Sequence, residues 1–120
     1  MKLSARILQN AIRLLWLVMF VLGFQFWMGR ATSMIPIHMR LGETLVLLLW
    51  ILAGIGIKVG VRVPLALGVI AYGFFVVGFG MTMGGMLPGS AHEIVRVLHL
   101  LIGIAALGAA EVVGGKIKRA

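Results

Sequence analysis

The sequence predicts an all-α integral membrane protein, a single domain of four transmembrane helices that covers residues 1–120. The chain is 62% hydrophobic and only 12% charged, and its mean hydropathy is +1.14. A soluble domain of this length has too little interior to bury so much apolar surface. The apolar residues also form four long and nearly uncharged runs. Each run is close to the roughly 20 residues that cross a bilayer, so the lipid bilayer is the first expected partner.

The expected spans are separated by short polar or glycine-rich segments. They cover residues 7–28, 36–57, 63–83 and 91–113. The first follows a basic lead-in, interpreted as an amphipathic segment at the membrane interface, and it ends in aromatic residues that favour this depth. A signal peptide has a similar start, but we interpret the segment as a span. Pro36 suits the first turn of the second span, and a capping box of Ser90 and Glu93 is expected to open the fourth.

The distribution of Lys and Arg predicts the orientation of the bundle. Only Arg30, Arg40 and Arg96 lie near one set of span ends, while the other eight basic residues lie near the opposite set: Lys2, Arg6, Arg13, Lys58, Arg62, Lys116, Lys118 and Arg119. Because cytoplasmic segments are rich in Lys and Arg, both termini are expected in the cytoplasm, with the protein in a bacterial inner membrane. This arrangement explains the net charge of +8 without a nucleic-acid partner. Glu111 is expected near Lys116 at the inner interface.

Two histidine-bearing ends are expected to face each other on the outer side of the bundle. His38 opens the second span, whereas His92 and His99 lie seven residues apart on one face of the fourth. Ionisable side chains are costly inside a membrane and mark functional sites. Such a pair is well suited to hold a haem iron, with His38 and His99 as the ligands. We prefer His99 to His92 because its neighbours are apolar, although His92 is closer in depth to His38.

Other residues near these histidines would complete a slot for haem b. Gly42 and Gly103 each follow a histidine by four residues, and they remove a side chain where a porphyrin edge would clash. Two glycines of the third span are expected to do the same, Gly73 and Gly80. Arg40 and Arg96 lie where the propionates would emerge, and His92 would be a propionate partner or part of a quinone site. The same glycines are also typical of close helix packing without any cofactor.

The second and fourth spans share the histidine–glycine spacing, and each has an Arg/Glu pair three residues apart. This indicates either an internal repeat of a helical hairpin or coincidence in a chain rich in Gly and Ala. The arrangement resembles small bacterial four-helix membrane proteins of the b-type cytochrome kind, similar to the cytochrome b561-like group. The resemblance rests on His38-x3-Gly42 after a proline, on LPGSAH (Leu87–His92) and on VLHLLIG (Val97–Gly103).

The resemblance covers most of the chain and implies that His38 and His99 are haem ligands and that electrons pass to or from a quinone. Two-haem members of that group need four ligand histidines, and this chain has three. The resemblance therefore implies at most one bis-histidine haem per chain, unless subunits share another.

Two other functions stay open at this point. One is a non-catalytic subunit of a larger respiratory or photosynthetic membrane complex that binds pigment, quinone or lipid. Its partners would be other subunits of the complex or, in a homo-oligomer, further copies of this chain. The other is a small transporter or channel with a histidine proton relay. The absence of cysteine excludes disulfides, iron–sulfur clusters and covalently attached haem. No enzyme motif is present, so the chain is at most an electron-transfer protein.

Overall fold

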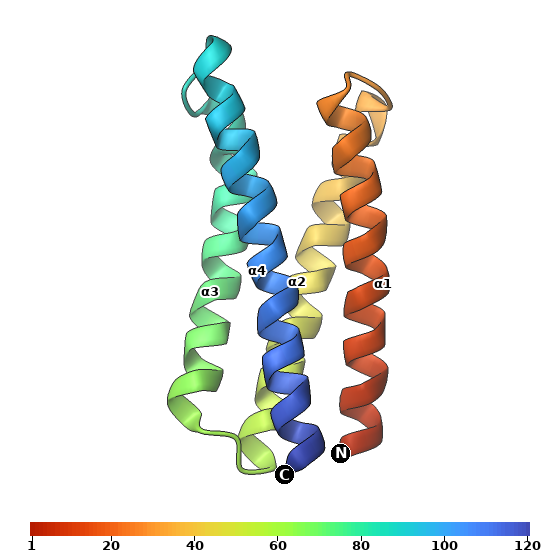
Figure 1. Cartoon of the computed structure of the whole chain (residues 1–120), viewed down its shortest axis with the longest axis vertical. Coiled ribbons are helices and arrows are strands. Elements are labelled where there is room, and N and C mark those ends of the chain that lie inside the picture. Colours follow the sequence, from red (N-terminus) through yellow and green to blue (C-terminus); the bar gives the residue numbers. More distant parts are fainter.

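The structure is a computed structural model that describes residues 1–120, and it is a bundle of four long helices (Figure 1). The long helices are α1 (Lys2–Trp27), α2 (Ile35–Lys58), α3 (Val63–Thr82) and α4 (His92–Arg119). Three short 3-10 helices lie in the loops at one end, η1 (Thr32–Met34), η2 (Met83–Gly85) and η3 (Gly89–Ala91). All four long helices are long and apolar enough to cross a membrane. The predicted all-α fold with four such helices is confirmed.

The helix ends agree closely with the expected spans in α2 and α3, whereas α1 and α4 are longer than expected. α1 begins at Lys2, so the lead-in expected at the interface is the first part of the spanning helix itself. No Gly or Pro precedes Gly23, so nothing in the sequence interrupts this helix. α4 continues past Val113 to Arg119, because packing against α1 overrides the low helix propensity of its two adjacent glycines. Both α2 and α3 begin with a proline in the first turn, as expected for Pro36 of α2.

The capping box expected at the start of α4 does not form. Ala91 occupies the N-cap position and no side chain caps the helix, while Ser90 belongs to η3. The carboxylate of Glu93 accepts a hydrogen bond from Arg96 at 3.5 Å instead. The preceding loop folds back over the helix start, where Nδ1 of His92 lies 2.8 Å from the carbonyl oxygen of Met86.

The buried core lies in the half of the bundle that contains both termini, which Figure 1 shows at the same end. α1 has no buried residue beyond Ile12, and α2 has none before Leu45. α3 has none beyond Gly73, and Val95 is the one buried residue of α4 before Ala106. Toward the other end, the α3–α4 pair separates from the α1–α2 pair (Figure 1). The two halves of the bundle are therefore packed very differently.

Three aromatic side chains form hydrogen bonds between helices near the middle of the bundle. They are Trp16 Nε1 to the carbonyl of Gly103 (2.9 Å), Trp50 Nε1 to that of Ile70 (3.1 Å) and the Tyr72 hydroxyl to that of Ile102 (2.7 Å). An N–H or O–H left unpaired in apolar surroundings is costly. These bonds satisfy the donors and connect α1 with α4, α2 with α3, and α3 with α4.

A polar cluster joins α1 to α4 nearer the termini. Arg13 donates to both carboxylate oxygens of Glu111, at 2.6 and 2.8 Å, and Gln9 donates to the same carboxylate at 2.9 Å. Glu111 therefore pairs with Arg13 of another helix and not with Lys116. Gly114 makes room for this cluster, since a Cβ there would lie 2.5 Å from Cδ of Gln9. Because the Arg–carboxylate pair is bidentate, it fixes the register of α1 against α4.

Gly73 is required where the Trp50 indole crosses α3. A Cβ at position 73 would collide with Nε1 of Trp50 and lie 3.0 Å from Cγ1 of Val46. We expect Gly73→Ala to lower the free energy of unfolding by about 1–3 kcal/mol, as overpacking does. The measurement is the thermal unfolding midpoint in detergent. Gly78→Ala is the matched control, because its Cβ would meet nothing within 4 Å and alanine favours the helix. Equal midpoints for the two variants would contradict the packing at Trp50.

Candidate functional site

The structure brings His38 and His99 together between α2 and α4. Their ring centroids are 6.2 Å apart, and the ring planes are inclined by 55°. Counted from the start of each helix, the two histidines lie at different depths, because His38 is the fourth residue of α2 and His99 is the eighth residue of α4. The difference disappears because α4 extends further outward than α2 by about one turn. Both histidines are half-buried.

Aromatic rings from the other two helices pack against this pair. Phe26 of α1 meets His38 edge-on, with ring centroids 5.3 Å apart and an interplanar angle of 77°. Phe79 of α3 is stacked on His99, with centroids 6.1 Å apart and an angle of 10°. Neither phenylalanine was expected at the site from the sequence. The four rings together form an aromatic cluster to which each long helix contributes one residue.

Each histidine also lies against a glycine of the helix that precedes its own. A Cβ at Gly23 of α1 would lie 3.6 Å from Cε1 of His38, and one at Gly80 of α3 would lie 3.7 Å from Cε1 of His99. Gly80 was expected near the site, whereas Gly23 was missed. The available signal was that Gly23 is the one glycine of the first span. In each helical hairpin, α1–α2 and α3–α4, the histidine of the second helix therefore lies beside a glycine of the first.

One nitrogen of each imidazole has no partner inside the protein. Nδ1 of His38 and Nδ1 of His99 are the two buried side-chain polar atoms that make no hydrogen bond. Leaving such an atom unsatisfied costs about 1–3 kcal/mol, and the rare cases in native proteins often have a functional reason. No group of three or more His, Cys, Asp or Glu residues is placed to hold a metal ion. The site therefore offers two imidazoles and no further protein ligand.

His92 is not part of this cluster. Its Nδ1 lies 2.8 Å from the carbonyl oxygen of Met86, in the loop between α3 and α4. This contact ties the start of α4 to the loop and engages one of its two ring nitrogens. The partner that the structure places beside His38 is therefore His99, and His92 lies about two helix turns further out.

Gly42 and Gly103 admit side chains of α1 and do not lie against the imidazoles. A Cβ at Gly42 would lie 3.1 Å from Cε of Met19. Gly103 lies beneath Trp16, whose indole N–H donates to its carbonyl oxygen. The glycines one turn inward from the histidines therefore serve helix packing, and those at the imidazoles belong to α1 and α3. Gly73, also expected at the site, packs against Trp50.

The two predicted Arg/Glu pairs form, but their arginines are placed differently. Arg40 contacts Glu43 at 3.2 Å and is 82% exposed, and it lies two residues from His38, about 200° around the helix. Arg40 therefore points away from the pair. Arg96 contacts Glu93 at 3.5 Å and is 42% exposed. It precedes His99 by three residues and so lies on the same helix face, one turn outward.

Comparison of the chain with protein-family models, with curated proteins and with solved structures found no match. No family is identified for the chain, and the four long apolar helices are consistent with a four-helix membrane protein.

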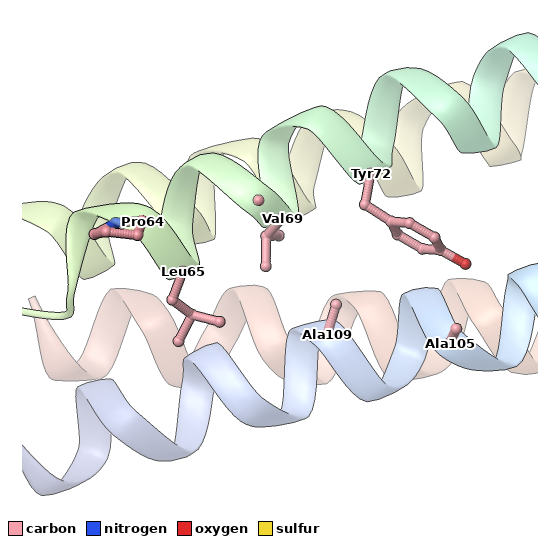
Figure 2. A pocket seen from close by; sticks show the side chains of 7 residues that line it. Pro64, Leu65, Val69, Tyr72, Ala105 and Ala109 are labelled. Carbon is pink, nitrogen blue, oxygen red and sulfur yellow. The ribbon is translucent and has the colours of Figure 1, made fainter.

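An open apolar groove lies between α3 and α4. Figure 2 shows its lining, with Pro64, Leu65, Val69 and Tyr72 on α3 and Ala105 and Ala109 on α4. Its volume is about 370 Å³. Its one polar side chain is Tyr72, whose hydroxyl already donates to the carbonyl of Ile102. With no free polar group to orient a ligand, this groove lacks the features of a specific site.

The register of α2 against α4 can be tested directly, because the chain has no native cysteine. We expect the double variant His38→Cys, His99→Cys to be joined efficiently by a short bifunctional thiol reagent in detergent. The variant His38→Cys, His92→Cys is the control, since residue 92 lies about 10 Å further along α4. Mass spectrometry of the intact chain measures the cross-linked fraction. More efficient joining of residues 38 and 92 would contradict the stagger between the helices.

Proposed function

We propose that the protein is a membrane b-type haem protein that holds one haem between His38 and His99. The observation that carries this proposal is their separation. Metal–imidazole bonds are about 2.0 Å long and the ring centre lies about 1.1 Å from the bonded nitrogen, so two rings on opposite sides of one iron have centroids about 6 Å apart. The centroids of His38 and His99 are 6.2 Å apart.

The ligand set also favours haem over a bare metal ion. A porphyrin supplies four nitrogens of its own, so two axial imidazoles complete the coordination of its iron. Protein zinc sites need three or four protein ligands, and no such group is present here. Ligation would use one nitrogen of each ring, and burial of both rings among phenylalanines would keep water from the metal. The unpartnered imidazole nitrogens are consistent with this use.

The surroundings of the pair provide space for a flat ring. α1 and α3 each pack against both α2 and α4 and lie on opposite sides of these two helices (Figure 1). A ring between the two imidazoles would extend toward α1 and α3. Both helices present a glycine beside the nearest histidine, Gly23 on α1 and Gly80 on α3. This end of the bundle also lacks a tightly packed core.

The remaining polar residues near the pair have distinct roles in this proposal. Arg96, oriented by Glu93, would bind a propionate one turn outward from His99. Arg40 points out of the bundle and is left out of the site. A bound haem supplies a one-electron couple between ferric and ferrous iron. The protein would then exchange electrons with a membrane quinone or another respiratory partner.

The distribution of basic residues supports an orientation for this activity. We place both termini in the cytoplasm and the histidines toward the outer face of a bacterial inner membrane. The eight basic residues named for the cytoplasmic side lie in the half of the bundle that holds both termini. Electron exchange through the haem would therefore take place close to the outer surface.

The test is the dithionite-reduced minus oxidised spectrum of the detergent-purified protein, produced with haem supplied. We expect the sharp α and β bands of a six-coordinate b haem at one haem per chain. His38→Ala and His99→Ala should each remove most of this haem, whereas His92→Ala should retain it because Nδ1 of His92 engages Met86. Arg96→Ala should weaken haem retention by about 10-fold, the lower end for loss of a supporting contact.

Substitution of the glycines beside the histidines separates a haem slot from simple helix contact. Gly23→Val and Gly80→Val should lower haem occupancy, whereas Gly84→Val, with nothing within 4 Å of its Cβ, should not. A colourless protein that remains folded would contradict the proposal and favour a subunit of a larger complex. Native spectra from both the His38 and His99 variants would contradict the ligand assignment.

A further inference from the structure

A small basic groove lies at the end of the bundle that holds both termini. Its volume is about 260 Å³. The turn between α2 and α3 and the last turn of α4 line it with Gly60, Val61, Arg62, Lys116, Arg119 and Ala120. Every charged side chain in this lining is basic. The groove is far from the histidine pair and has no part in the proposed haem site.

The positive charge of the groove is not neutralised by any acidic side chain. The chain has three acidic residues, and each is paired with an arginine elsewhere, Glu43 with Arg40, Glu93 with Arg96 and Glu111 with Arg13. No ion pair involves Arg62, Lys116 or Arg119. The main-chain carboxylate of Ala120, which also lines the groove, makes no ion pair with these residues. Three positive side chains against this one carboxylate leave the groove with a net positive charge that favours an anion.

The parts of the groove are held in place by local structure. The turn is fixed by the N–H of Val61, which donates to the carbonyl of Gly56 at 2.8 Å, and by Gly60, whose φ of 97° suits glycine. The guanidinium of Arg119 folds back onto α4, where Nη1 would lie 3.2 Å from a Cβ at Gly115. The basic side chains thus extend from ordered backbone.

Helix electrostatics explain only some of these charges. Lys116 and Arg119 lie in the last turn of α4, where cations interact favourably with the helix dipole. Arg62 occupies the N-cap position of α3, where a cation is unfavourable. The helix dipole therefore does not account for the charge at position 62.

We propose that this groove binds the phosphate of an anionic phospholipid headgroup. Four apolar helices end here, so the groove lies at the level where the hydrocarbon of a bilayer gives way to headgroups. Basic pockets at the ends of membrane helices attract anionic lipids, and each nearby Lys or Arg adds to the affinity. The phosphate binds between Arg62 of the turn and the two basic residues of α4, and the acyl chains lie along the apolar helices.

The test is native mass spectrometry of the detergent-purified protein titrated with phosphatidylglycerol, or with phosphatidylcholine of the same acyl chains. We expect phosphatidylglycerol to bind more tightly than phosphatidylcholine. The triple variant Arg62→Gln, Lys116→Gln, Arg119→Gln should lower the affinity for phosphatidylglycerol at least about tenfold. The matched control is Lys2→Gln, Arg6→Gln, Lys58→Gln, which removes three charges from the same end but outside the groove. The affinity of this control variant for phosphatidylglycerol should fall by less than about threefold. Circular dichroism checks that both variants stay helical.

Each other outcome overturns the proposal. An equal loss in the two variants shows a diffuse attraction of the whole end for anions. Unchanged affinity in the groove variant shows that these residues do not bind the lipid. Inorganic phosphate at millimolar concentration provides the last arm: if it displaces phosphatidylglycerol, the groove is a site for free phosphate. Retention of the lipid in its presence, with the expected loss in the groove variant, supports a headgroup site.

Discussion

The structure depends on one constraint, that a polar group away from water must find its partner inside the protein. The middle of the bundle and the half that holds both termini meet this constraint. The indoles of Trp16 and Trp50 and the hydroxyl of Tyr72 donate to backbone carbonyls of neighbouring helices. The carboxylate of Glu111 is shared by Gln9 and Arg13. These bonds, with the small residues packed between the helices, fix how the four helices meet.

The opposite half departs from the same constraint at one place. The two imidazoles of His38 and His99 are side by side, and each keeps one buried nitrogen without a partner. The contrast within a single bundle is informative, because every other buried side-chain polar atom is satisfied. A chain that satisfies an indole with a carbonyl 2.9 Å away has the means to satisfy a histidine. The unpartnered nitrogens at this pair therefore support the haem site that we propose from the separation of the two rings.

The sequence was sufficient for the helices and insufficient for their contacts. Hydropathy and length located all four spans, because an apolar run of about 20 residues has few alternatives. The choice of His99 over His92 rested on the apolar neighbours of His99. The matching depth of His99 and His38 depends on how far α4 extends beyond α2, which the sequence of one helix does not determine. Gly42 and Gly103 lie against Met19 and Trp16 of α1, contacts that spacing along one helix does not reveal. Gly23 and the Arg13–Glu111 pair were missed for the same reason.

The uneven packing of the two halves has a consequence for assembly. The half with the termini holds the helices together by its own side chains, and the histidine pair lies outside this packed half. The other half separates into two hairpins, each with its own histidine, glycine and phenylalanine. If the pair binds haem as we propose, the cofactor would reach it from the bilayer between these two hairpins and would not need to cross a water-filled channel. Loading from the lipid phase would make the membrane itself the reservoir of the cofactor.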